Sequence, residues 1–502
     1  MTQKPLTAEA HNRRRLLMER SRPGRVGAAL PASDVPPQLM PETSLLRDDL
    51  ELPEVTEGEV VRYFTHLSQL NFSVDTNFYP LGSCTMKYNP KLNEAIASLP
   101  GFAAVHPHQP ERQVQGALEV MYRLQGYLTE VTGLPAISLA PLAGAQGELA
   151  GVLTIRAALE ARGQGHRRKM LIPDTAHGTN PATAAMAGFH VVSVPSDADG
   201  NIDLDALRAE ADDDLVGIMQ TQPSTLGLFD RNAVEMCRIV HEAGGLVYGD
   251  GANMNALLGR VKLGDLGFDV VHMNLHKTFS TPHGGGGPGS GPICVTEALA
   301  PFLPGPVAVA RPVDGDPMVT GAGGGNTTYG LEMPEHSIGR IGGAQGNFGV
   351  LVRAFTYISL LGDTGMLDIS GNAVLNANYL LAKLRPLYEL PYDRPVMHEV
   401  VFSAKKRPGA SALDVSKRLL DHGFHAPTMY FPLVVAEALM IEPTETESKE
   451  TLDAFIETLE RIDAEAAEDE GFLHQAPFET PVSRLDETRA ARQPHLRWEP
   501  PA

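Results

Sequence analysis

Short apolar runs alternate with helical patterns through the middle of the chain. The runs are rich in β-branched side chains and a few residues long, which is typical of buried strands. The strands predicted in this way are Met170–Ile172, Val191–Val194, Val216–Met219, Leu246–Tyr248, Val270–Met273 and Ile293–Val295. Strands separated by helices indicate the α/β class, with a mostly parallel central sheet covered by helices on both faces.

Polar residues follow several of these strands directly. His177 comes shortly after the first strand, and Thr221 and Asp250 end two later runs. His276 and Lys277 come after the run that ends at Met273. Because ligands bind beyond the carboxyl ends of parallel strands, we expect these side chains to converge at one edge of the sheet.

The flanks of this region have a different pattern. A proline-containing, irregular start precedes a helix over Glu57–Leu70, and another helix over Phe348–Leu361 leaves the sheet region. A smaller α/β unit follows. It is predicted to contain a strand at Val400–Phe402, a helix near Val415–Leu420, an extended segment at Tyr430–Val435 and an amphipathic helix with a Thr444–Glu447 capping box.

These patterns predict three regions. Residues 1–110 form an N-terminal arm and loop segment, residues 111–365 form the large domain, and residues 366–502 form the small domain and a tail. The chain has 502 residues, enough for two domains and an arm.

Composition and charge narrow the classes of function. A net charge of −20 argues against nucleic acid and anionic membranes as partners. No uninterrupted apolar stretch is long enough to span a bilayer. Cys84, Cys237 and Cys294 give neither a disulfide framework nor a metal-ligand spacing, so we expect no metal and a cytoplasmic location.

Lys277 is the strongest candidate for chemistry. It ends an apolar run and precedes a glycine tract, which suits a Schiff base to pyridoxal 5'-phosphate (PLP). Asp250 lies at another strand end, where a buried carboxylate would keep the PLP ring nitrogen protonated. The alternatives are an ordinary surface lysine and a helix-capping aspartate.

Other residues complete the predicted cofactor site. An imidazole at His177 would stack on the pyridine ring, although a loop histidine with ordinary partners fits too. The small residues Gly144 and Ala145, with Gln146, begin a helix whose amides could bind phosphate, as many helix starts could. The further predicted cofactor contacts are Ala252, Thr221 and His276.

The sequence of two further segments allows either a structural or a functional interpretation. Asn326–Thr328 is either a turn or a second phosphate contact. The polar loop Asp75–Pro90 is either a structural loop or part of the substrate entrance. Within it, Cys84 has no neighbour in sequence that would make it a nucleophile.

Long strings of residues resemble a known family. They include Asp75–Pro90, Asp174–Ala182, Asp250–Ala256, Asn274–Phe279 with its glycine tract, and Ser337–Arg340. With these the chain resembles the PLP-bearing half of glycine decarboxylase, the P-protein of the glycine cleavage system, in its split bacterial form.

The resemblance implies a PLP-dependent transferase of fold type I, similar to aspartate aminotransferase. It also implies decarboxylation of glycine with transfer of the aminomethyl group to the lipoyl arm of H-protein. A second, homologous subunit that lacks PLP is the implied partner, in an assembly of two copies of each. The alternative is another fold-type I enzyme, an aldolase or decarboxylase of a small amino acid, that needs no lipoyl acceptor.

Overall fold

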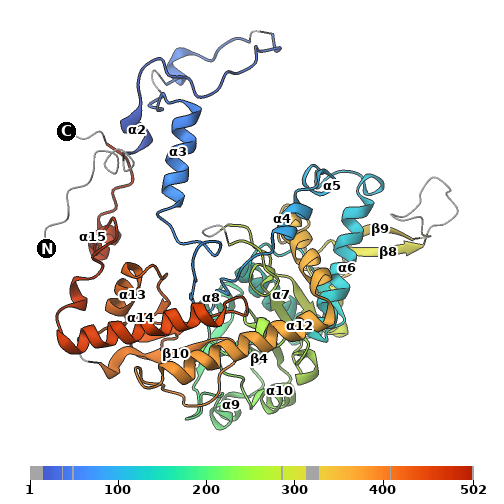
Figure 1. Cartoon of the computed structure of the whole chain (residues 1–502). Helices are drawn as coiled ribbons and strands as arrows, with labels where there is room; N and C mark the ends of the chain where they lie inside the picture. Colours follow the sequence, from blue (N-terminus) through green and yellow to red (C-terminus); the bar gives the residue numbers. More distant parts are fainter. Residues whose placement is uncertain are drawn as a thin grey trace. The chain divides into compact units, whose positions relative to one another are not determined.

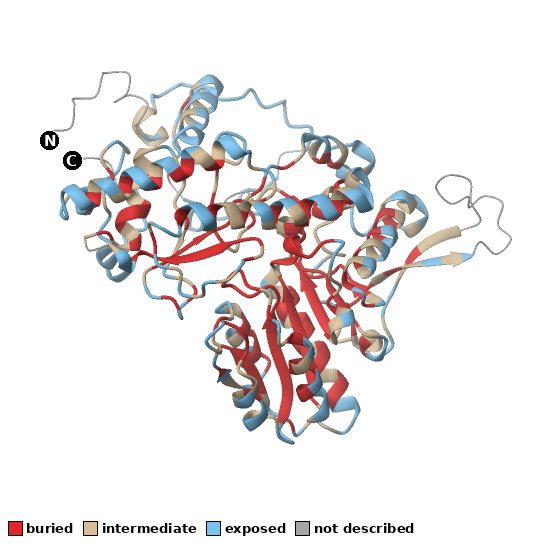
Figure 2. Cartoon of the chain, turned by 60° about the horizontal axis from the view of Figure 1, so that its bottom comes forward, coloured by how far each residue is buried: buried red, intermediate tan, exposed pale blue. Residues whose placement is uncertain are grey.

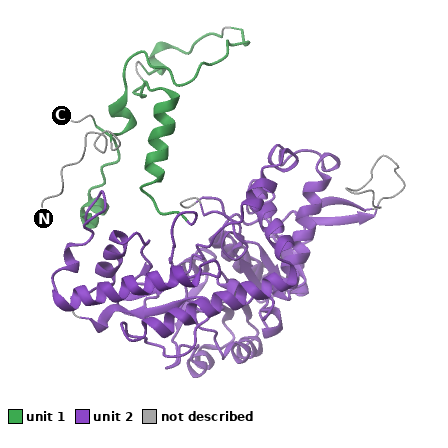
Figure 3. Ribbon diagram, in the orientation of Figure 1, with its two compact units in different colours: residues 1–73, 484–502 green, residues 74–483 purple. Residues whose placement is uncertain are grey.

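The structure is a computed structural model that describes residues 15–36, 38–47, 50–283, 287–312, 327–407 and 409–499. The chain forms two compact units, shown in Figure 3. Unit 1 comprises Met1–Ser73 and Arg484–Ala502, and unit 2 comprises Val74–Ser483. The domain boundaries predicted after residues 110 and 365 both fall inside unit 2 and stay a prediction.

A seven-stranded sheet, of which Figure 1 labels β4, forms the centre of unit 2. The order of its strands is β1-β7-β6-β5-β4-β2-β3. Its strands are β1 (Ala136–Ser138), β2 (Lys169–Pro173), β3 (His190–Val194), β4 (Leu215–Thr221), β5 (Leu246–Gly251), β6 (Val270–Met273) and β7 (Ile293–Val295). The pairs from β3 through β6 are parallel, and only β7 pairs antiparallel, with β6 and with β1. The mostly parallel sheet and all the predicted strands are confirmed.

Helices cover both faces of this sheet because alternate strand residues point in opposite directions. In β6, Val271 packs with the core that includes α6 (Gln115–Thr132) and α10 (Ala233–Glu242). Its neighbour Val270 packs with the core of α7 (Gly144–Ala161) and α8 (Thr179–Met186). The strands are therefore buried on both sides, as Figure 2 shows in red.

The long helix α12 (Phe348–Leu384) connects the large sheet to the small one. Its predicted end at Leu361 coincides with a break at Gly362, whose φ of 62° and ψ of −168° are not helical, and the helix then resumes. Among the described residues, α12 is the one helix long and apolar enough to cross a membrane by length and composition. Its buried residues, from Val350 to Leu384, belong to the core of unit 2.

The small sheet has three antiparallel strands in the order β10-β12-β11. They are β10 (Val400–Ser403), β11 (Thr428–Met429) and β12 (Ala438–Ile441), with α13 (Ala412–Asp421) and α14 (Lys449–Glu468). The predicted strand at Val400–Phe402, the helix near Val415–Leu420 and the final amphipathic helix are confirmed.

Two details of this region were predicted wrongly. Tyr430–Val435 is a turn rather than an extended segment, and Tyr430 has a φ of 58°. The N-cap of α14 is Ser448, which accepts from the amide of Thr451 at 3.2 Å, so Thr444 is not the capping residue. The apolar residues of the turn suggested an extended segment, and a threonine close to the helix start suggested an N-cap.

The remaining elements are short. Unit 2 also contains α4 (Lys91–Ala97), α5 (Pro100–Ala103), α9 (Leu204–Glu210), α11 (Leu275–Thr278), and the hairpin of β8 (Val307–Pro312) and β9 (Thr327–Glu332). Unit 1 contains α2 (Leu17–Arg20), α3 (Glu57–Ser68) and α15 (Glu487–Arg492) among its described residues.

Candidate active site

The polar strand ends of unit 2 meet around one cavity of about 200 Å³. Its lining comes from the ends of β4, β5 and β6, the starts of α7 and α11, and the turn before α8. The lining residues are Ser83, Gly144, Ala145, Glu148, His177, Thr179, Thr221, Thr225, Asp250, Ala252, Asn253, His272, Asn274, His276 and Lys277. The structure therefore brings together all the predicted site residues except Gln146.

Lys277 lies in the single turn of α11, directly after β6, and is half-buried. Among the described residues, none forms a hydrogen bond to its amine. Its positive charge acts on Cys84, Glu148 and His177, and shifts the pKa of each. An amine without a hydrogen-bond partner that faces a cavity is available for covalent attachment.

Asp250 is buried at the end of β5 and is surrounded by donors. Its Oδ1 accepts from the amide of Ala252 at 3.0 Å, and its Oδ2 accepts from Thr221 Oγ1 and Asn180 Nδ2, each at 3.4 Å. His272 Nε2 lies 3.5 Å from Oδ1. Carboxylate oxygens accept hydrogen bonds from several donors at once, so this arrangement suits a partner for a cationic ring nitrogen.

His177 lies at the open side of the cavity, where its side chain is exposed. Its Nδ1 is 2.7 Å from Thr179 Oγ1 and accepts from the amide of Thr179 at 3.2 Å, which fixes the ring in the turn before α8. Partial burial is the main cause that lowers its pKa; Asp250 opposes this and Lys277 adds to it. The ring is therefore neutral at pH 7 and free to stack on a planar group.

The start of α7 places Gly144 and Ala145 on the cavity wall. A Cβ atom on Gly144 would lie 2.6 Å from Asn274 Oδ1, so only glycine allows this close approach. No side chain caps the helix, which leaves its first amides free for an anion.

Gln146 does not line the cavity. Its Oε1 accepts from the amide of Leu142 at 2.6 Å, and its Nε2 donates to the carbonyl of Ile341 at 2.7 Å. The structure thus gives the side chain a role in holding the turn before α7, and a phosphate contact can involve only its backbone.

His276 and His283 lie edge to face with ring centroids 5.5 Å apart. Burial, Lys277 and His283 lower the pKa of His276 to about 3, and burial and Lys277 lower that of His283 to about 4. His276 Nδ1 accepts from the amide of Ser290 at 3.2 Å. Both rings are neutral at pH 7, so Lys277 has no cationic histidine beside it.

Sequence reasoning missed several residues of the cavity. Glu148, on α7, and His272, inside β6, are both buried, and Glu148 Oε2 and His272 Nε2 have no hydrogen-bond partner. Burial and Asp250 raise the pKa of Glu148 to about 8, against the opposing charge of Lys277. A histidine within an apolar strand and a glutamate within a small-residue helix were the available signals.

The loop around Cys84 also reaches this cavity, through Ser83. Burial raises the pKa of the Cys84 thiol, although Lys277 opposes the shift. The thiol is therefore protonated at pH 7, as expected for a residue that is no nucleophile. Of the predicted segment Asn326–Thr328, Asn326 lies outside the described residues, and Thr327 and Thr328 begin β9.

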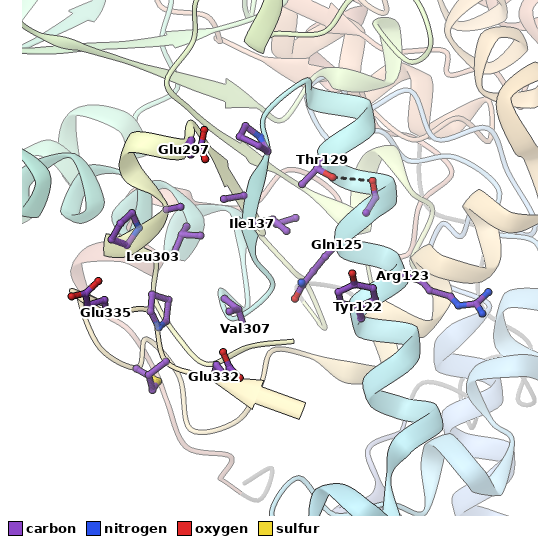
Figure 4. A pocket seen from close by; sticks show the side chains of 17 residues that line it. Tyr122, Arg123, Gln125, Thr129, Ile137, Glu297, Leu303, Val307, Glu332 and Glu335 are labelled. Atoms are coloured by element: carbon purple, nitrogen blue, oxygen red, sulfur yellow. Dashed lines mark hydrogen bonds between the residues drawn. The ribbon is translucent and has the colours of Figure 1, made fainter. Parts of the chain in front are cut away.

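A larger cavity of about 660 Å³ lies between α6 and the β8–β9 hairpin (Figure 4). Its lining includes Tyr122, Arg123, Ile137 and Glu297, and no lysine or histidine among the described residues. In the described part of the chain, this larger cavity lacks a pair of a lysine and a buried aspartate, which the smaller cavity has in Lys277 and Asp250.

Comparisons with known proteins agree with this geometry. A protein from Halalkalibacterium halodurans named probable glycine dehydrogenase (decarboxylating) subunit 2 is 54% identical over 491 residues, which cover 96% of this chain and 98% of that protein. One of the same name from Desulforamulus reducens is 52% identical over 493 residues, covering 97% and 99%. The chain belongs to the family of glycine dehydrogenase (decarboxylating) subunit 2.

The family model for the glycine dehydrogenase C-terminal domain matches residues 369–476 of this family member. A crystal structure of glycine decarboxylase (P-protein) of the glycine cleavage system, in inhibitor-bound form, has a TM-score of 0.71 at 20% identity and covers 84% of this chain and 93% of that one. A cysteine desulfurase from Thermococcus onnurineus has a TM-score of 0.58 at 16% identity, covering 78% and 96%. These likenesses confirm the predicted aspartate aminotransferase-like fold type I.

Proposed function

We propose that this chain is the PLP-bearing subunit of a glycine decarboxylase of the glycine cleavage system. In this function it decarboxylates glycine and transfers the aminomethyl group to the lipoyl arm of H-protein. The observation that carries the proposal is that Lys277 and Asp250 line one cavity in a chain that matches glycine dehydrogenase subunit 2 proteins over nearly its whole length.

The cavity fits PLP in several respects. The free amides of α7 suit a phosphate, the half-buried Lys277 suits an aldehyde, and the donor-surrounded Asp250 suits a cationic ring nitrogen. Buried polar atoms without partners, Glu148 Oε2 and Asn274 Oδ1, face the same space and are expected to gain partners from the cofactor. When bound, PLP supplies an aldehyde for covalent attachment and a ring that accepts the electron pair released with carbon dioxide.

Each of the other side chains of the cavity would have a separate role. Asp250 would keep a ring nitrogen protonated, His177 would stack on the ring, and Thr221 and Ala252 orient the Asp250 carboxylate. His276 is neutral and its Nδ1 is occupied, which favours the Lys277 amine as the group that moves a proton near the substrate.

The partners and location follow from the family. A homologous subunit 1 without PLP, in an assembly of two copies of each subunit, and lipoylated H-protein are the proposed protein partners, with glycine as substrate. The proposed location is the cytoplasm. No role with nucleic acid or membranes is proposed, in keeping with the net charge of −20.

The test is exchange of carbon between glycine and labelled bicarbonate, with the chain alone and with the homologous subunit and H-protein added. We expect exchange only in the complete mixture, and borohydride reduction should attach the cofactor to Lys277. The variant Lys277→Ala should lose the label and at least about a thousandfold of the exchange rate. Lys262→Ala, which removes an exposed lysine paired with Glu130, should retain both.

Two results would contradict the proposal. Lipoyl-dependent exchange that survives Lys277→Ala would remove this lysine from the chemistry. Decarboxylation that proceeds at full rate without any lipoyl protein would identify another fold-type I activity on a small amino acid.

A further inference from the structure

Two buried side chains, Tyr248 and His272, lie next to Asp250, and His272 also lines the cavity. Tyr248 precedes Asp250 by two residues in β5, and His272 lies opposite Asp250 on β6. The Tyr248 hydroxyl is 2.5 Å from His272 Nδ1, and the two rings are nearly parallel, at 14°. His272 Nε2 lies 3.5 Å from Asp250 Oδ1.

Helix α7 seals this group from solvent. A Cβ atom on Gly151 would lie 2.7 Å from the Tyr248 ring, and one on Gly147 would lie 3.3 Å from His272 Cβ. Both aromatic residues are almost completely buried. The pairing therefore depends on fixed groups and not on water.

The chemistry of the pair determines where the His272 proton lies. Burial raises the pKa of the Tyr248 phenol well above its usual value, so the hydroxyl is protonated and donates. His272 Nδ1 must then accept. Burial also lowers the pKa of His272, with Asp250 opposing, so the ring is neutral and its single proton lies on Nε2, toward Asp250.

We propose that Tyr248 and His272 are positioning residues that orient Asp250 toward the cofactor ring nitrogen. Tyr248 selects the Nε2–H tautomer of His272, and His272 directs that proton to Asp250 Oδ1, which limits rotation of the carboxylate. The 3.5 Å separation is long for a hydrogen bond, and contacts of this kind shorten when a site is filled. This inference rests on the proposed cofactor function.

Other charged and titratable groups around His272 do not supply the same constraint. Glu148, on α7, and Lys277 line the same cavity as His272, and Lys277 acts to lower the pKa of His272. His276 is neutral and has its Nδ1 bonded to Ser290. The Asn274 side chain makes a polar contact with the His272 side chain that acts to raise its pKa, whereas the Tyr248 hydroxyl makes the 2.5 Å contact with Nδ1.

A double-mutant cycle on the apoprotein tests the proposal, with the dissociation constant of PLP as the readout. Tyr248→Phe removes one oxygen, lets either tautomer of His272 form, and should weaken PLP binding about tenfold, the worth of one buried hydrogen bond. His272→Gln places an amide donor near the Nε2 position and has no tautomer to select. In that background Tyr248→Phe should weaken binding less than about twofold.

Tyr388→Phe is the matched control, because Tyr388 is also buried and its hydroxyl has no hydrogen-bond partner. It should leave the dissociation constant unchanged. An equal loss from Tyr248→Phe in both backgrounds would show general destabilisation and overturn the inference, as would no loss in the parent protein. If the parent protein takes up no PLP at Lys277, the proposed function itself fails, which is a separate outcome.

Discussion

At the scale of single residues, the chemistry of the cavity depends on which of its side chains are charged. The histidines around Lys277 are neutral because burial and the lysine itself oppose their protonation. Glu148 is held as an acid by burial and by Asp250. Lys277 and Asp250 therefore lie among histidines and a glutamate that are neutral at pH 7.

The acid form of Glu148 makes a testable link between pH and stability. Its pKa rises from about 4.5 when unfolded to about 8 when folded, so the folded chain holds an extra proton between these values. The loss of folding stability caused by Glu148 is absent below pH 4.5 and increases up to pH 8. Glu148→Gln should therefore raise the free energy of unfolding of the apoprotein more at pH 8 than at pH 5. The difference should be on the order of 3 kcal/mol.

Urea unfolding of both proteins at the two pH values measures this difference. Glu160→Gln, which removes an exposed carboxylate paired with Arg156 on the same helix, should change stability by less than about 1 kcal/mol at either pH. A pH-independent effect of Glu148→Gln would show that Glu148 ionises normally in the folded chain.

At the scale of elements, the loop 83–87 connects the small sheet to α11. Glu399 accepts from the amide of Ser83 at 2.7 Å, and Glu442 accepts from the amide and hydroxyl of Thr85 at 2.8 and 2.7 Å. These bonds hold Ser83 and Thr85 at φ of 61° and 49°, which non-glycine residues adopt at a cost. His398 lies beside both glutamates, and the three are completely buried.

Lys87 extends this connection to α11, the turn that carries Lys277. Its amine donates to the carbonyl of Thr278 at 2.7 Å, to Tyr357 at 3.0 Å and to Glu445 at 2.8 Å, and it is 2% exposed. Burial favours the neutral amine, but Glu445 and Tyr357 outweigh it and raise the pKa of Lys87. The backbone that carries Lys277 is thus tied to the loop by a satisfied, buried cation.

Replacing this cation should be costly. Lys87→Met leaves the Glu445 carboxylate buried without its partner, and we expect a loss of about 3–5 kcal/mol in the free energy of unfolding. The double variant with Glu445→Leu should recover at least half, because no unpaired charge remains. Lys91→Met, at an exposed pair with Asp75, should cost less than about 1 kcal/mol; equal losses at both lysines would contradict the argument.

At the scale of the whole molecule, unit 1 exposes many large apolar side chains for its size. Leu30 is 88% exposed, Leu39 100% and Leu45 76%. Where exposed apolar side chains are this frequent in a segment, an interaction surface is the usual explanation. In the proposed function the homologous subunit is the partner that would cover them.

This proposal predicts a specific defect in assembly. Leu39→Ser combined with Met40→Ser should lower the affinity for the homologous subunit by about tenfold or more, measured by analytical ultracentrifugation of mixtures. Borohydride labelling of Lys277 should be unchanged, because that residue lies in unit 2. Val234→Ser, at an exposed position of α10, is the control; assembly that is equally strong in all three proteins would show that this segment takes no part.

Much of the architecture is determined by local pattern. The strand runs, the fold class and the positions of Lys277 and Asp250 at strand ends could be predicted, because short apolar runs and the polarity of a parallel sheet are encoded locally. The short strands β1 and β12 and the turn at Tyr430 could not, because their conformations depend on partners distant in the chain.

The tertiary structure alone decided how the site works. It placed Glu148 and His272 near Asp250 and Tyr248 against His272, and directed the Gln146 side chain away from the cavity. Charge states and tautomers depend on burial and on neighbours that other elements bring close. The residue types alone do not determine either the burial or the neighbours. The sequence by itself determined which groups end the strands; folding determined which of them are charged, paired or left facing the cavity.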